Sequence, residues 1–135
     1  MIELLYFIWN ANPEIISGFP PRWYGLLFAS GFIVGSYIMR WMYKLESRDP
    51  EEVERLTMYM VVSTIIGARV GHCLFYDPVY YLSNPIKILY IWEGGLASHG
   101  AAISIILGML IYSRKVGENF FWVMDRIVIV VCLAG

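Results

Sequence analysis

Two residues of this sequence place polar chemistry inside stretches that are otherwise apolar. Arg69 stands in the run "LTMYMVVSTIIGARVGHCLFY", and His99 stands in the run "LASHGAAISIILGMLIY". Ionisable residues inside a membrane are costly, and they generally face a cavity or a partner. An arginine binds phosphate through charge-assisted hydrogen bonds, and a histidine can remove a proton near neutral pH. The pair therefore suits a reaction on a phospholipid headgroup, in which arginine holds the phosphate and histidine activates a nucleophile.

Helical geometry predicts that several such groups share one depth. Arg69 precedes Tyr76 by seven residues, which places it roughly 10 Å below the outer end of its helix. His99 lies roughly 5 Å below the same boundary. His72 and Tyr76 follow Arg69 on one helical face, and Tyr24 lies at the outer end of the first apolar run. We therefore expect groups from three helices to converge on one outward-facing pocket.

Some of these residues also fit a purely structural role. Tyr24 and His72 are suited to the aromatic and polar belt at a membrane interface. His99 fits a histidine whose hydrogen bonds are satisfied inside a packed core as well as it fits a functional group. The small residues that follow it, Gly100 and Ala101, would allow a ligand to approach closely.

Four apolar stretches predict the helices that carry these residues. About 20 apolar residues cross a bilayer, and 59% of the 135 residues are hydrophobic while 16% are charged. The predicted spans are residues 23–43, 56–76, 96–112 and 120–135. The last one stops at the chain end without interface anchors, so we expect the chain to be cut within or just after its fourth helix. The predicted fold class is all-α: a polytopic transmembrane protein, with residues 1–135 forming part of a single membrane domain.

The charges between the spans predict their orientation. Basic residues concentrate between the first and second spans and between the third and fourth: Arg40, Lys44, Arg48, Arg55, Arg114 and Lys115. The positive-inside rule makes both connections cytoplasmic, so the N-terminus and residues 77–95 face outward. The segment 77–95 is rich in tyrosine and contains Pro78 and Pro85. We expect it, like the N-terminal "MIELLYFIWNANPE", to lie along the outer surface.

Several protein classes receive no support from the composition. The net charge is −1 and no basic tract suggests nucleic acid. Cys73 and Cys132 both lie within apolar runs, and neither a disulfide framework nor a metal-ligand spacing is visible. The N-terminus has the acidic Glu3 where a signal peptide has basic residues.

Other residues within the spans are predicted to serve packing. Two Gly-x-x-x-Gly pairs, which begin at Gly31 and Gly67, allow helices to approach closely. Asp125 and Arg126 lie near the cytoplasmic end of the fourth span. They are expected to extend toward the interface or to pair with neighbouring helices.

The order of motifs resembles that of the prolipoprotein diacylglyceryl transferases. The resemblance runs from about residue 22 to the end of the chain. It rests on "RWYGLLF", "GARVGHCLFY", "YYLSNPIKILYIWEGGLASHGA" and "FFWVMDRI". The most specific motif is "IWEGGLASHG", which matches the family's Trp-x-Gly-Gly-x-x-x-His-Gly string. The resemblance implies a bacterial inner-membrane enzyme with about seven spanning helices. Such an enzyme transfers the diacylglyceryl group of phosphatidylglycerol to the lipobox cysteine of a preprolipoprotein, without a cofactor or metal.

The resemblance also implies roles for individual residues. His99 matches the family's essential histidine, a candidate base for the cysteine thiol, and Tyr24 matches its functional tyrosine. Arg69 matches the arginine of the Gly-x-Arg-x-Gly string, and we expect it to hold the lipid phosphate. Ser98 and Gly100, on either side of the histidine, are predicted to contact the substrate with it.

Two matches imply no catalytic role. Asp125 matches a family aspartate that is expected to be structural. His72 stands where the family often has tyrosine.

Two alternatives remain at this point. Because the chain ends before family signatures that complete the phospholipid site, we expect it to be inactive by itself. A small non-catalytic lipid-binding protein would need no such signatures. A transporter-like protein would need polar groups that continue toward the cytoplasm, and the third span offers none between Ser104 and Tyr112.

Overall fold

The structure is a computed structural model that describes residue 17 and residues 23–134, and it is all-helical over these residues. The all-α prediction is therefore confirmed, whereas the N-terminal segment lies outside the described residues. Five α-helices are present in the described ranges: α1 (Trp23–Leu45), α2 (Glu52–Tyr76), α3 (Pro78–Ser83), α4 (Ser98–Val116) and α5 (Phe120–Ala134). Two 3-10 helices, Pro85–Leu89 and Ile91–Glu93, lie between α3 and α4.

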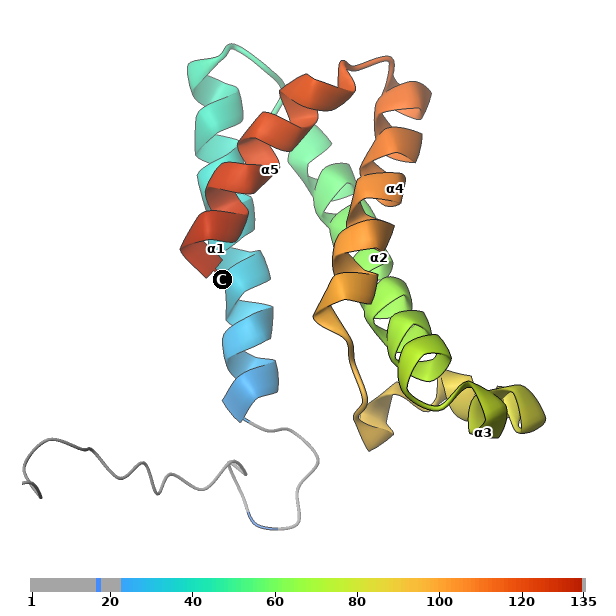
Figure 1. Ribbon diagram of the computed structural model, residues 1–135. Coiled ribbons are helices and arrows are strands. Elements are labelled where there is room, and N and C mark those ends of the chain that lie inside the picture. The colour runs from blue at the N-terminus through green and yellow to red at the C-terminus, as the bar shows by residue number, and fades with distance from the viewer. Residues whose placement is uncertain (1–16, 18–22, 135) are drawn as a thin grey trace, which may run out of the picture.

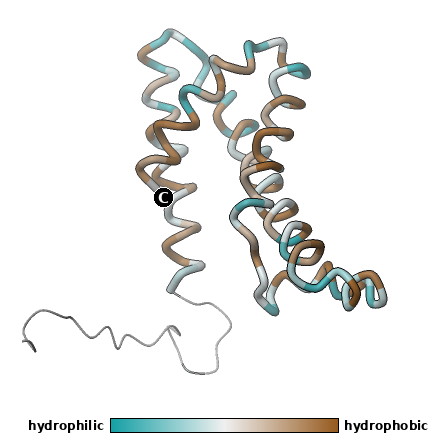
Figure 2. Tube along the Cα trace, viewed as in Figure 1, coloured by the Kyte–Doolittle hydropathy of each residue, from teal (hydrophilic) through white to brown (hydrophobic). Residues whose placement is uncertain are grey.

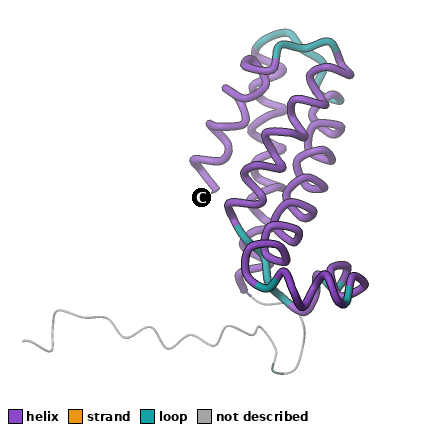
Figure 3. Tube along the Cα trace, turned by 45° about the vertical axis from the view of Figure 1, so that its right-hand side comes forward, coloured by secondary structure: helices purple, strands orange, loops and turns teal. Residues whose placement is uncertain are grey.

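The four long helices form two packed pairs. Helix α4 lies against α2 along most of its length, and α5 packs against α1 (Figure 1). The connections 46–51 and 117–119, which carry or adjoin the basic residues, lie at one end of the bundle. Helix α3 and the 3-10 helices lie at the opposite end and project to one side (Figure 3). The segment 77–95 thus forms a short irregular layer across one end of the α2–α4 pair.

Two of the predicted spans meet the requirements for crossing a membrane by length and composition. These are α1, with 23 residues, and α2, with 25 residues. Helix α4 has 19 residues but carries His99 in its first turn and Arg114 and Lys115 in its last, and α5 has 15 residues. Hydrophobic residues line the long helices, and hydrophilic residues gather at the basic connections (Figure 2).

The α2–α4 contact brings two backbones together over small residues. Ser63, Gly67 and Gly71 on α2 meet the small residues of α4 at four-residue intervals. A Cβ added at Gly67 would lie 2.5 Å from the carbonyl oxygen of Gly100, and one added at Gly71 would lie 2.7 Å from its Cα. The prediction that the Gly67 pair serves close helix packing is therefore confirmed. Gly35 of the other pair instead meets a side chain, since a Cβ added there would lie 2.5 Å from Cγ1 of Val130 on α5.

The buried core lies toward the end with the basic connections. It joins residues of all four long helices: Met39, Tyr43, Val53, Leu56, Met109, Tyr112, Val123 and Ile127. Many other large apolar side chains are exposed, for example Ile33, Val62 and Leu133. An apolar exterior over a modest core is the arrangement expected of helices surrounded by lipid.

Charged and aromatic groups tie the basic connections together. Two guanidinium groups lie over the indole ring of Trp122: the central carbon of Arg48 is 4.3 Å and that of Arg126 is 3.9 Å from the ring centroid. Arg48 also bonds Glu118, and this hydrogen bond raises the pKa of the Arg48 side chain. Arg126 donates to both carboxylate oxygens of Glu46, at 2.7 and 2.8 Å from Nη2. Of the two roles expected for Arg126, the structure shows pairing with a neighbouring segment.

The α2–α4 contact predicts a large effect of a single methyl group. Gly67→Ala is expected to lower the free energy of unfolding by about 1–3 kcal/mol, because the added Cβ overpacks a backbone contact. Gly25→Ala is the matched control, since nothing lies within 4 Å of an added Cβ there. Reversible unfolding in mixed micelles measures both variants. Equal stability of Gly67→Ala and the parent chain would contradict the observed packing.

The contact of Arg126 with Trp122 predicts that Arg126 contributes more to stability than Arg40 does. Arg126→Ala removes a ring contact together with a two-oxygen ion pair, so a loss of about 1–2 kcal/mol is expected. Arg40→Ala removes a pair with Glu54 whose side chains are 39% and 68% exposed, and such pairs contribute only about 0.2–1 kcal/mol. The same unfolding assay compares them. A larger loss for Arg40→Ala would show that the ring contact contributes little.

Candidate functional site

Arg69 lies in the second half of α2, buried beneath the segment that leads to α4. Its side chain is 3% exposed. Its Nε donates to the carbonyl of Ile88 at 2.9 Å, and its Nη2 donates to that of Lys87 at 2.7 Å. Its Nη1 donates to the carbonyls of Gly94 and Gly95, the latter at 3.3 Å. Because a buried charge is tolerated only when its donors are satisfied, these four bonds explain how the guanidinium remains buried.

The backbone of α2 adds one more bond to the same segment. The amide of Ala97 donates to the carbonyl of Ala68 at 2.9 Å. Ala97 is the N-cap residue of α4 and has an extended backbone. The ring of Tyr81 faces the guanidinium of Arg69, 5.2 Å from its central carbon. The start of α4 is therefore fixed against one face of α2.

His99 lies in the first turn of α4 and is exposed. Its ring centroid is 5.0 Å from that of Phe75 and 6.2 Å from that of Tyr76. His72 stacks on Tyr76 as well, and the two ring centroids are 5.1 Å apart. The two histidines thus contact the same tyrosine at the end of α2. The imidazole of His99 is thus held beside aromatic rings at the end of α2 while remaining exposed.

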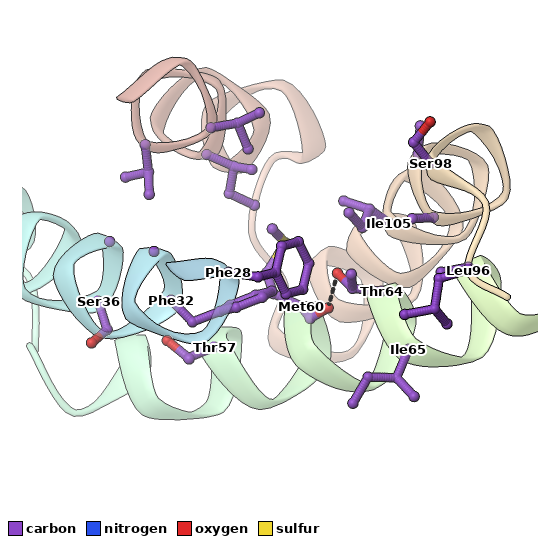
Figure 4. A pocket seen from close by; sticks show the side chains of 18 of the residues that line it. Phe28, Phe32, Ser36, Thr57, Met60, Thr64, Ile65, Leu96, Ser98 and Ile105 are labelled. Carbon is purple, nitrogen blue, oxygen red and sulfur yellow. Dashed lines mark hydrogen bonds between the residues drawn. The ribbon is translucent and has the colours of Figure 1, made fainter. Parts of the chain in front are cut away.

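A separate cleft of about 600 Å³ lies between α1, α2, α4 and α5. Its walls are mostly apolar, and Figure 4 shows Phe28, Phe32 and Ile105 among the side chains that line it. The hydroxyl of Thr64 donates to the carbonyl of Met60 at 2.7 Å, within its own helix. The hydroxyl of Thr57 bonds Val53 in the same way. With these hydroxyls occupied, the cleft offers a hydrocarbon-like surface to an occupant.

The predicted site residues fall into two groups around this cleft. Tyr24, which is 72% exposed, and Ser98 line it, at the end where α4 begins. Arg69, His99 and Gly100 are not among its lining residues. Gly100 is buried against α2, so its backbone serves the helix contact. The expected convergence of Tyr24 with Arg69 on one pocket is therefore not shown.

Sequence reasoning missed two parts of this site. The carbonyl groups that receive Arg69 belong to residues 87, 88, 94 and 95, and a carbonyl has no residue-type signature. The adjacent glycines Gly94 and Gly95 were the available signal, because both adopt positive φ, 86° and 77°. The apolar wall that includes Phe28 was missed because lipid-facing and cleft-facing residues have the same composition.

The arrangement limits the chemistry that the described residues can perform. An exposed imidazole can accept a proton, a buried guanidinium supplies a fixed positive charge, and the cleft can hold hydrocarbon. Among residues 17 and 23–134, no group of three or more His, Cys, Asp or Glu side chains could hold a metal ion. These features define an all-helical protein with two candidate membrane spans and an exposed imidazole next to Ser98, which lines an apolar cleft.

A comparison with protein-family models identifies the family within this class. The model described as prolipoprotein diacylglyceryl transferase matches residues 13–135. The chain belongs to the prolipoprotein diacylglyceryl transferase family.

Individual relatives agree with the family match. The chain is 45% identical over 130 residues to a phosphatidylglycerol–prolipoprotein diacylglyceryl transferase of Tolumonas auensis, covering 94% of this chain and 50% of the relative. It is 48% identical over 128 residues to the protein of that name from Porphyromonas gingivalis, covering 92% and 45%. The relative from Chloroherpeton thalassium is 42% identical over 125 residues, covering 90% and 47%. The chain spans about half the length of the curated relatives it matches.

Proposed function

We propose that this chain forms the first half of a transferase that moves the diacylglyceryl group of phosphatidylglycerol to the cysteine thiol of a lipobox-containing preprolipoprotein. The family match and the names of the relatives support this reaction. The observation that carries the proposal for this chain is the exposure of His99 in the first turn of α4, beside residues that line an apolar cleft.

In the proposed reaction His99 is the base. A free thiol has a pKa near 8.5 and is mostly protonated at neutral pH. The imidazole takes the thiol proton as sulfur attacks the terminal glyceryl carbon of the diacylglyceryl group. The carbon–oxygen bond to phosphate breaks and a carbon–sulfur bond forms. Glycerol phosphate leaves with the electron pair of the broken bond and receives a proton in turn, so the products are a thioether and glycerol phosphate.

The donor lipid is proposed to lie in the apolar cleft between α1, α2, α4 and α5, at the end where α4 begins. Its acyl chains match the apolar lining, and Tyr24 and Ser98 lie where the glyceryl region would emerge. Gly100 contributes through the close backbone approach that holds the histidine turn against α2. Arg69 remains a predicted phosphate contact, but four of its five N–H groups already bond carbonyls, which leaves one Nη2 hydrogen for a lipid.

We propose an inner-membrane topology in which the four long helices span the bilayer, as half of a domain with about seven spans. The basic connections 46–51 and 117–119 lie at the same end of the bundle, which supports placing both in the cytoplasm. The segment 77–95 and His99 then face the outer leaflet, where the preprolipoprotein presents its cysteine. No nucleic acid or cofactor takes part in this scheme.

One observation favours a second function. The apolar cleft by itself suits a non-catalytic lipid-binding protein, which would use the same walls without His99. A transporter-like function receives less support, because the lining residues that could contact a polar solute toward the basic end, such as Thr57 and Thr64, have their hydroxyls bonded within α2.

A chimera tests the proposed role of His99. Residues 13–135 of this chain replace the matching half of the Porphyromonas gingivalis relative, and transfer of labelled diacylglyceryl groups to a lipobox peptide is measured. His99→Gln is expected to lower the rate at least about 100-fold, because a general base contributes on the order of 10²–10⁴-fold. His72→Gln is the matched control and should retain activity within about fivefold of the parent. Retained transfer in His99→Gln would remove the histidine from the mechanism, and an inactive parent chimera with normal lipid binding would favour the second function.

A further inference from the structure

One guanidinium group joins the two ends of the segment 87–95. Its Nε and Nη2 bond the carbonyls of Ile88 and Lys87, and its Nη1 bonds those of Gly94 and Gly95. The backbone between these anchor points is therefore closed into a loop around the side chain of Arg69. Lysine could not make this set of bonds, because its donors diverge from a single nitrogen.

The surroundings of Arg69 show no competing anionic partner. Within the described residues no carboxylate forms an ion pair with Arg69. The ion pairs that do occur in these ranges join side chains that are more exposed than Arg69. Carbonyl dipoles and the face of the Tyr81 ring surround the charge instead. A side chain 3% exposed and directed at four carbonyls is organised to hold backbone.

The held segment leads directly to the histidine turn. The carbonyls of Gly94 and Gly95 can reach Arg69 because both residues adopt positive φ. A Cβ at Gly95 would lie 2.5 Å from Nε2 of His72, so the loop is packed tightly on α2 at this point. Two residues later Ala97 bonds Ala68, and α4 begins with Ser98 and His99. The first turn of α4 is therefore connected to Arg69 through a short stretch of backbone that is hydrogen-bonded to α2 at Gly94, Gly95 and Ala97.

We propose that Arg69 is a positioning residue: it locks the segment 87–95 onto α2 and thereby sets the place and direction of the first turn of α4. The effect on transfer rests on the proposed function of His99, whereas the locking of the segment does not. This role differs from a phosphate contact in a measurable way. A lock acts on the backbone of the segment in the absence of any lipid donor.

The rate of tryptic cleavage after Lys87 measures how firmly Arg69 holds the segment 87–95. Lys87 is the trypsin site within the segment, and Arg69 bonds both the carbonyl of the scissile peptide and the next one. In detergent-solubilised chain, Arg69→Gln is expected to speed cleavage after Lys87 at least about tenfold, because local opening no longer breaks these bonds. Arg126→Gln, a matched change at the opposite end of the bundle, should leave that rate unchanged. Cleavage after Arg114 and Lys115 reports on the rest of the fold.

The outcomes of the proteolysis separate the possibilities. Faster cleavage confined to Lys87 supports the lock, and an unchanged rate there overturns it. If Arg69→Gln accelerates cleavage at every site, Arg69→Lys decides. That variant keeps the charge but cannot bond the four carbonyls from three separate nitrogens. Faster cleavage after Lys87 alone therefore supports the lock, and any other pattern overturns it.

Kinetics in the chimera test the consequence for the reaction. If Arg69 positions the histidine turn, Arg69→Lys lowers kcat at least about tenfold while the KM for phosphatidylglycerol changes less than about twofold. A raised KM with little change in kcat would show that the residue binds the lipid, and would overturn the positioning role. Should the parent chimera be inactive, the proposed function fails and the proteolysis still decides whether Arg69 locks the segment.

Discussion

The backbone contact between α2 and α4 is the constraint on which the rest of this structure depends. Gly67 and Gly71 meet Gly100 so closely that the two helices act as one unit. On α2, Arg69 lies between the two glycines of this contact. On α4, His99 directly precedes Gly100. The buried Arg69 thus owes its position to neighbouring glycines, whose lack of side chains lets the two helices approach. Without this approach the carbonyls of the segment 87–95 would not lie within reach of the guanidinium.

The two ends of the bundle are stabilised by different physical means. At the basic end, side chains of three separate segments meet around Trp122, and the charges keep partial access to water. At the other end a single buried charge is matched by backbone carbonyls. The first arrangement is weakened by salt, because ions screen partly exposed pairs. The second requires the backbone of the segment 87–95 to keep one conformation.

The sequence predicted the elements well and their lateral arrangement poorly. Hydrophobic runs located α1, α2, α4 and α5 to within a few residues, because burial in a bilayer demands a continuous apolar stretch. Depth along a helix axis is calculated from the constant rise per residue. Depth gives no direction around the bundle axis, so Tyr24 and Arg69, expected together, lie in different surroundings. The acceptors of Arg69 could not be read from residue types at all.

The pairing of α1 with α5 has a consequence for how the chain is made. Of the described helices α1 is synthesised first, yet its principal partner is the last of them, and Glu46 can pair with Arg126 only after α5 has been made. The α2–α4 pair can form once α4 has been synthesised, whereas α1 lacks its principal partner until α5 follows. Among the described helices, α1 therefore gains its principal partner only when α5 has been made.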